Sequence, residues 1–386
     1  MWQGVADRRM IYLDNNATTR VLPEVLEAML PFYTEFWGNP SSMHTFGSQV
    51  AKHIDAAREQ ASALIGAQRE SEIVFTSGGT ESNHLALRGL LAAHPDKRHI
   101  ITTQVEHSSV LMLCKQLEKE GYAVTYLGVD QNGALDPEEI KNAIRPDTAM
   151  ATIVWANNET GVLFPIEAIS KICAAKKIPI HVDAIQAVGK IAIDIKKTDV
   201  DCLSVSGHKI HGPKGTGLLY IRRGTKWMPQ TFGGHQERGR RSGTENVPGI
   251  IGLGKAAELA SGRLKNNAWE KIAKLKDGLE QKLAAQFQNC IVNGKKSPRL
   301  PNTSSLSFEG LEGETICLLL DEEGIAASTG SACAAGSLEP SHVLKAMGVN
   351  HKQARGTIRI SMSFETTEKE AEPAASKLEQ IITRLK

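Results

Sequence analysis

The sequence has little of what marks a secreted, membrane-bound or nucleic-acid-binding protein. It has six cysteines in 386 residues and no Cys-x-x-Cys spacing, which argues against a disulfide framework. Its formal net charge is only +2, so no nucleic-acid partner is expected. No apolar run approaches the ~20 residues that cross a bilayer, and the first residues lack the apolar core of a signal peptide. We therefore expect a cytoplasmic protein that does not associate with membranes.

Apolar runs alternate with helix-length amphipathic segments through the first two thirds of the chain. This pattern predicts an α/β fold, with a largely parallel sheet and helices on both of its faces. The strand-like runs lie at residues 72–77, 99–104, 150–156, 178–184, 202–207 and 215–223.

Beyond about residue 245 the pattern changes to a long helical stretch, two further strand-like runs and a last amphipathic helix, which predicts a smaller α+β domain. We expect a large domain over residues 15–260. A small domain is expected from residues 1–14 together with 261–386.

Polar residues follow the ends of several predicted strands. Thr80, His107, Asn158, Asp183 and Lys209 all occupy such positions. In open α/β sheets, ligands bind outside the carboxyl ends of the strands. We therefore expect these side chains to converge on one edge of the sheet.

Each of these residues also has an ordinary structural interpretation when it is taken singly. Lys209 could be a surface lysine in a turn, Asp183 a helix N-cap and His107 a structural histidine. Together they match the needs of pyridoxal phosphate, which uses a lysine for a Schiff base, an acid for its ring nitrogen and a cradle for its phosphate. Gly78–Thr80, leading into a helix, would supply that cradle. Nucleotide sites fit less well, because neither GxxxxGK[ST] nor a strand followed by GxGxxG occurs.

The chain resembles the cysteine desulfurases from Tyr12 to about Ser363. The resemblance implies pyridoxal-phosphate fold type I, with a mostly parallel seven-stranded sheet, and a role in supplying sulfur for iron–sulfur clusters. The stretch "STGSAC" looks like the group with a long cysteine loop, here about residues 326–345, and "RSGTENVPGIIG" leans toward the nitrogen-fixation type. The motifs that carry the resemblance are "YLDNNATT", "FTSGGTESN", "EHSSV", "ANNETG", "HVDAIQAVGK", "SGHKIHGPKGTGLLY", "RSGTEN" and "STGSAC".

This resemblance implies roles for the residues in these motifs. Lys209 would hold the cofactor and move the substrate's α-proton, and His107 would stack on the ring and take part in acid–base steps. Arg359 would grip the substrate carboxylate, with a fork geometry that lysine cannot reproduce. The other implied cofactor contacts are Asp183 at the ring nitrogen, Gln186 and Asn158 near the ring oxygen, and Gly79, Thr80, Ser206 and His208 at the phosphate. Thr244 would reach the phosphate of a neighbouring subunit, which implies a homodimer.

Cys333 is surrounded by serine, alanine and glycine, where a buried apolar role is not expected. The resemblance implies that L-cysteine becomes L-alanine while Cys333 takes the sulfur as a persulfide and passes it to an acceptor protein. Such an acceptor would be an iron–sulfur scaffold. A free thiol with a pKa of ~8.5 is only slightly ionised near neutrality, so the site must activate it.

Other functions remain open at this stage. A selenocysteine lyase or an aminotransferase on the same fold would also need Lys209, but not Cys333 in the same way. A sulfur-carrier module with a vestigial cofactor site is a third hypothesis. The sequence predicts no metal site, and it does not decide which acceptor takes the sulfur or whether the enzyme serves nitrogenase maturation or general cluster assembly.

Overall fold

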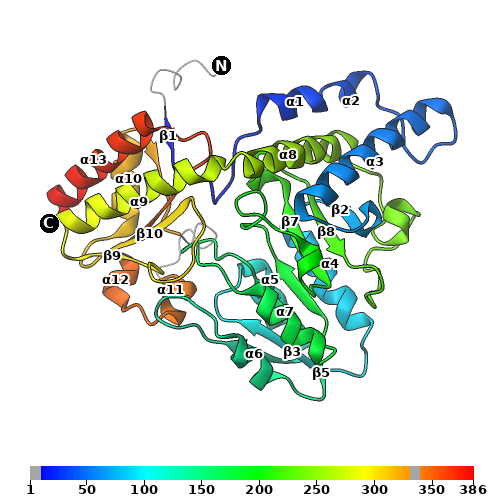
Figure 1. Cartoon of the computed structure of the whole chain (residues 1–386), viewed down its shortest axis with the longest axis horizontal. Coiled ribbons are helices and arrows are strands. Elements are labelled where there is room, and N and C mark those ends of the chain that lie inside the picture. The colour runs from blue at the N-terminus through cyan, green and yellow to red at the C-terminus, as the bar shows by residue number, and fades with distance from the viewer. Residues whose placement is uncertain (1–9, 331–339) are drawn as a thin grey trace.

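The computed structural model describes residues 10–330 and 340–386 (Figure 1). A seven-stranded sheet has the order β2-β8-β7-β6-β5-β3-β4, and all neighbours are parallel except those of β8. The mostly parallel α/β sheet predicted from the sequence is therefore confirmed. The strands are β2 (Ile73–Thr76), β3 (His99–Thr103), β4 (Ala123–Leu127), β5 (Thr148–Val154), β6 (Ile180–Asp183), β7 (Cys202–Ser206) and β8 (Gly217–Ile221).

Helices cover both faces of this sheet because successive strand residues point to opposite sides. Ile101 faces one apolar cluster with Phe75, and its neighbour Ile100 faces another with Val74. The first cluster takes residues from α1 (Pro23–Met29), α2 (Pro31–Thr34), α3 (Thr45–Ile65), α6 (Pro137–Ala143), α7 (Ile166–Ala175) and α8 (Val247–Lys265). The second takes residues from α4 (Gly79–Ala92) and α5 (Ser108–Lys119).

The C-terminal elements gather beside the large sheet, from yellow to red in Figure 1. An antiparallel sheet has the order β12-β10-β9, and a short parallel pair joins β1 to β11. The strands are β1 (Ile11–Tyr12), β9 (Cys290–Val292), β10 (Thr303–Phe308), β11 (Ile325–Ala326) and β12 (Thr357–Ser361). The helices are α9 (Ala268–Gln286), α10 (Gly313–Glu322), α11 (His342–Ala346), α12 (His351–Arg355) and α13 (Glu368–Leu385).

Local signals set the ends of several helices. The Nδ1 atom of His44 accepts from the backbone N–H of Gly47 at the start of α3, and Gly66 ends that helix with a φ of 68°. A capping box between Thr367 and Glu370 begins α13. Among the described helices, none combines the length and apolar character that a bilayer crossing requires.

The chain's first described residues pack with its last third. Leu13 belongs to an apolar cluster with Leu306, Ile358 and Leu378. The division into a large domain, 15–260, and a small domain, 1–14 with 261–386, stays a prediction. The residues just after β1 lie at the carboxyl ends of the strands of the large sheet, where Lys209 contacts Asn16 and Ala17.

Candidate active site

A cavity of about 290 Å³ lies at the carboxyl ends of β5, β6 and β7. It collects side chains from segments far apart in the sequence, as expected for the strand ends of an α/β sheet. The residues predicted from the sequence that line it are Gly79, Thr80, His107, Asn158, Asp183, Gln186, Ser206, His208, Lys209 and Arg359. Asn16, Ala17, Ser109, Val154, Ala156, Ile185 and Gly330 complete the lining.

Asp183 ends β6 and is 3% exposed. Its Oδ1 atom accepts from the backbone N–H of Ile185 at 3.0 Å, and its Oδ2 atom accepts from the Nδ2 atom of Asn83 at 2.8 Å. Two donors therefore hold the carboxylate in its cavity-facing position.

His107 joins the same hydrogen-bonded chain. The Asn83 amide also donates to the Ser109 hydroxyl at 2.9 Å, and that hydroxyl lies 2.8 Å from the Nδ1 atom of His107. Nδ1 accepts from the backbone N–H of Ser109, so a neutral His107 carries its proton on Nε2. Asn83 and Ser109 were not predicted from the sequence, although Asn83 lies three residues after Thr80 on one face of a helix.

Lys209 closes a short turn, Gly207–Lys209, directly after β7. Its Nζ atom donates to the backbone carbonyls of Asn16 at 2.5 Å and Ala17 at 2.8 Å. The amine is thus held inside the cavity by main-chain oxygens, at a position set by the end of a buried strand.

Asn16 connects several parts of the site. Its carbonyl also accepts from the Gln186 amide at 2.9 Å, and its own amide donates to the carbonyl of Asn158 at 3.1 Å. Asn16 lies in the motif "YLDNNATT", but it was not predicted to be a site residue. A further unpredicted residue, Lys190, is 4% exposed and donates to the Gln186 Oε1 at 2.5 Å. Burial, together with the charges of Lys209 and Arg359, lowers the pKa of Lys190 well below its usual value.

The N-terminus of α4 and the end of β7 meet at one side of the cavity, where Gly79, Thr80, Ser206 and His208 lie. A Cβ atom on Gly79 would lie 2.2 Å from the Cδ1 atom of Ile185, so any larger residue there requires the Ile185 side chain to move. Burial and the charge of Lys209 lower the pKa of His208 to about 4. Backbone N–H groups at a helix start, with hydroxyl and imidazole donors, make a phosphate cradle.

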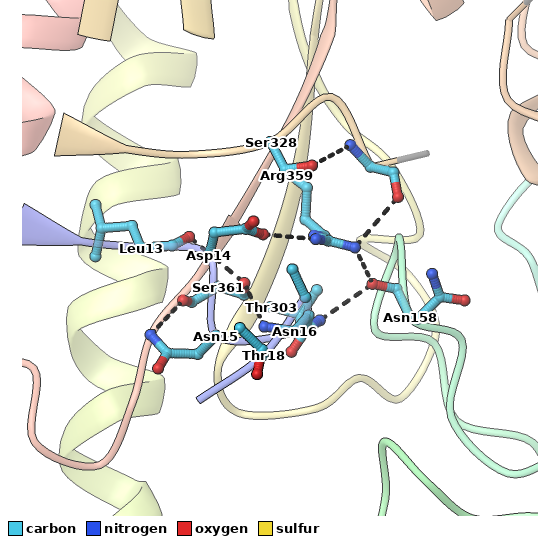
Figure 2. Close-up of polar contacts among 12 residues, drawn as sticks. Leu13, Asp14, Asn15, Asn16, Thr18, Asn158, Thr303, Ser328, Arg359 and Ser361 are labelled. Carbon is cyan, nitrogen blue, oxygen red and sulfur yellow. Dashed lines mark hydrogen bonds and ion pairs between the residues drawn. The ribbon is translucent and has the colours of Figure 1, made fainter. Parts of the chain in front are cut away.

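Arg359 lies in β12 and is 2% exposed. Its Nη1 atom donates to the carbonyls of Asn158 at 3.1 Å and Gly330 at 3.2 Å, and its Nη2 atom lies 2.6 Å from the Asp14 carboxylate. Figure 2 shows the guanidinium between Asp14 and Asn158. It brings a fork-shaped cation to the cavity that contains Lys209.

Among the predicted residues that the structure describes, Thr244 does not belong to the cavity lining. Thr244 lines a separate cavity of about 210 Å³ with Ser77, Arg241 and Asn246. Cys333 lies outside the described residues, so its role stays a prediction. Just beyond that gap, the Ser341 hydroxyl donates to the Oε2 atom of Glu159 at 2.5 Å.

The residues present fit pyridoxal phosphate. The cavity presents an amine at Lys209, a buried carboxylate at Asp183, and a glycine whose missing side chain leaves room at a helix N-terminus. Lysine, acid and phosphate cradle are the three groups that this cofactor requires of a protein.

Comparison with known proteins gives the same result. Residues 11–373 match the family model described as aminotransferase class-V. The chain is 55% identical over 98% of its length to a cysteine desulfurase of Trichormus azollae, covering 94% of that protein. It is 50% identical over 97% of its length to the cysteine desulfurase NifS of Azotobacter vinelandii, covering 93% of it. A solved NifS-like protein superposes with a TM-score of 0.90 at 40% identity, over 97% of this chain and 100% of the other.

The fold and the cavity define a pyridoxal-phosphate enzyme of fold type I. The chain belongs to the class-V aminotransferase family and, within it, to the cysteine desulfurases. The family resemblance inferred from the sequence motifs is confirmed.

Proposed function

We propose that the enzyme converts L-cysteine to L-alanine and transfers the sulfur to Cys333 as a persulfide. The observation that carries this proposal is the convergence of Lys209, Asp183, His107 and Arg359 on one cavity in a chain of the cysteine desulfurase family. In this reaction one thiol and one L-cysteine give one persulfide and one L-alanine, so the transfer consumes no outside oxidant or reductant.

Residues of the cavity hold the cofactor and take part in proton transfer. Pyridoxal phosphate, when bound, supplies an aldehyde for an amine and a ring that draws electrons from the substrate's α-carbon. Lys209 anchors it and moves the proton at that carbon through Nζ, and Asp183 keeps a proton on the ring nitrogen. Gly79, Thr80, Ser206 and His208 hold the phosphate.

The substrate is oriented by two groups. The Arg359 guanidinium receives its carboxylate, and Asn158, whose carbonyl already accepts from Arg359, lies beside it. His107 lines the same cavity, where it would stack on the ring of the bound cofactor and would offer its Nε2 proton for acid–base steps. With the substrate held in this way, the Cys333 thiolate attacks the substrate sulfur: an S–S bond forms as the C–S bond breaks, and a proton completes alanine.

Three further statements about the enzyme belong to this proposal. It acts as a homodimer, in which Thr244 reaches the partner's cofactor phosphate. Two observations support this: Thr244 lines a cavity separate from the one that contains Lys209, and the apolar side chains Trp37, Met43 and Phe232 are exposed. The sulfur of the persulfide passes to an iron–sulfur scaffold or another acceptor protein. The enzyme is of the nitrogen-fixation type of the family. The enzyme works in the cytoplasm, where a thiol stays reduced; the cysteines of the described residues are free.

One experiment tests the proposal. The purified protein with pyridoxal phosphate is incubated with L-cysteine and a thiol reductant, and alanine and sulfide are measured together. Equal yields are expected. Cys333→Ala should retain the cofactor and bind L-cysteine without forming sulfide, and Lys209→Ala should form neither product. Sulfide formation by Cys333→Ala at the parent rate contradicts the nucleophile assignment, and absence of both products in the parent protein contradicts the function.

A further inference from the structure

A carboxylate lies directly behind the arginine of the cavity. The Nη2 atom of Arg359 donates to the Oδ1 atom of Asp14 at 2.6 Å, in the contact drawn in Figure 2. Among the described residues, the cavity lining includes Arg359 but not Asp14. Asp14 therefore contacts the guanidinium from outside the cavity, where it can act only through Arg359.

The backbone holds Asp14 in register with the strand that carries Arg359. Asp14 forms a parallel bridge with Ser361, two residues after Arg359 in β12. The N–H of Ser361 donates to the carbonyl of Leu13 at 2.7 Å, and the N–H of Asn15 donates to the carbonyl of Ser361 at 3.0 Å. Figure 2 shows further contacts between Ser361 and the neighbours of Asp14, from the Asn15 side-chain amide to the Ser361 carbonyl and from the Ser361 hydroxyl to the Leu13 carbonyl. The carboxylate and the guanidinium are thus carried by two neighbouring backbone segments whose hydrogen bonds fix their register.

The contacts of Arg359 fix the orientation of its guanidinium. An arginine side chain has five N–H donors. Two of them, on Nη1, point to the carbonyls of Asn158 and Gly330, and one, on Nη2, points to Asp14. The Nε atom is buried and has no hydrogen-bond partner among the described residues. Three acceptors on three different segments of the chain therefore hold the guanidinium in place.

The charge around the cavity explains why a counter-anion is needed. Arg359 is 2% exposed, and its charge, with that of Lys209, contributes to lowering the pKa of the buried Lys190. A buried guanidinium without an anion is unfavourable, and would turn toward other acceptors when no substrate is present. A partner that holds it in place reduces the ordering that binding must otherwise supply.

We propose that Asp14 is a positioning residue that neutralises Arg359 and fixes the orientation of its guanidinium at the cavity for the substrate's carboxylate. The inference rests on the proposed function, which makes Arg359 the carboxylate-binding group. Asp14 touches neither the substrate nor the reacting atoms, so its effect falls on binding of a carboxylate and not on the later steps.

The test compares Asp14→Ala and Asp14→Asn in the holoenzyme. Loss of one charge-assisted hydrogen bond should raise KM for L-cysteine about tenfold in Asp14→Ala and leave kcat within about twofold. Asp14→Asn keeps an oxygen acceptor and should lie between the parent and Asp14→Ala. Binding of cysteamine, which is cysteine without its carboxylate, is measured by the change in cofactor absorbance and should be unaffected in both variants. The control is Glu365→Ala, which removes the partner of the exposed Arg20.

Each outcome decides a separate statement. If Arg359→Lys raises KM for L-cysteine and the Asp14 variants do not, the inference is wrong and the proposed carboxylate-binding role of Arg359 stands. If the Asp14 variants weaken the binding of L-cysteine and of cysteamine equally, Asp14 has only a general structural role and the inference is again wrong. If Arg359→Lys leaves KM unchanged, the carboxylate-binding role itself fails. Should Asp14→Ala not fold, Asp14→Asn decides the question by the same two ligands.

Discussion

The Asn83 amide donates at once to the Asp183 carboxylate, at 2.8 Å, and to the Ser109 hydroxyl, at 2.9 Å. It thereby connects the acid expected at the cofactor's ring nitrogen with the imidazole of His107 expected over the ring. All of these groups are carried on ends of secondary structure, so the rigid parts of the fold set their spacing. One side chain outside the cavity lining aligns two that belong to it.

Replacing Asn83 by leucine should lower kcat about tenfold, because a buried carboxylate that loses a donor is disfavoured by about 1–3 kcal/mol. The absorbance of the bound cofactor should change as well, since Asp183 then holds the ring proton less well. Steady-state kinetics and an absorbance titration with pH check both statements. Gln116→Ala, an exposed substitution on α5, is the control. Parent kinetics in Asn83→Leu would contradict the aligning role.

Gly79→Ala should weaken binding of pyridoxal phosphate by at least about tenfold, since the new methyl group would overlap the Cδ1 atom of Ile185. Adding Ile185→Ala removes the overlapping atoms and should restore part of the affinity. Affinity is measured by fluorescence titration of the apoprotein. Gly278→Ala, where a Cβ meets nothing within 4 Å, serves as the matched glycine control. An unaltered affinity in Gly79→Ala would show that this helix start does not hold the cofactor.

Glu106 should make the enzyme less stable as the pH rises. It is fully buried, and burial raises its pKa to about 8. Above its normal pKa the unfolded chain releases a proton that the folded chain keeps, so the free energy of unfolding falls by about 1.4 kcal/mol per pH unit until about pH 8. Glu106→Gln removes this dependence, and its stability relative to the parent should increase between about pH 5 and 8. Urea unfolding at several pH values measures the difference. If the free energies of unfolding of the parent and of Glu106→Gln change in parallel with pH, Glu106 is not a neutral buried carboxyl group.

The Arg58–Glu237 ion pair should contribute strongly to stability. Both side chains are nearly buried, two hydrogen bonds of 2.7 and 2.9 Å join them, and Glu237 also accepts from the backbone of Phe75 at 3.0 Å. Glu237→Ala leaves a buried guanidinium unpaired and should cost about 3–5 kcal/mol. The exposed pair tested by Glu365→Ala should cost about 0–1 kcal/mol. Denaturant unfolding of both variants decides whether the two pairs differ in this way.

Much of the fold and site could be predicted because the information is local. The alternation of strands and helices predicted the sheet, and the position of Asp183 and Lys209 at strand ends predicted their convergence. Asn83 was missed because its role depends on a carboxylate a hundred residues away, although its helical spacing from Thr80 was visible. Cys333 remains a prediction from the motif.

Asp14 and Asn16 could not be predicted from local pattern. They follow a strand of only two residues, too short to show a period, and their partners Arg359 and Lys209 come more than 190 residues later. Lys190 is a further case, since a lysine in sequence is expected at the surface and only the packed structure shows it buried.

The pairing of β1 with β11 has a consequence for biosynthesis. Ile11 aligns with Ile325, and Tyr12 with Ala326, so the first described strand finds its neighbour only after more than 300 further residues have been synthesised. The residues that follow β1 carry the carbonyls on which Lys209 rests. A nascent chain can therefore form its large sheet early, yet it acquires a finished catalytic centre only after β11 and β12 have been synthesised.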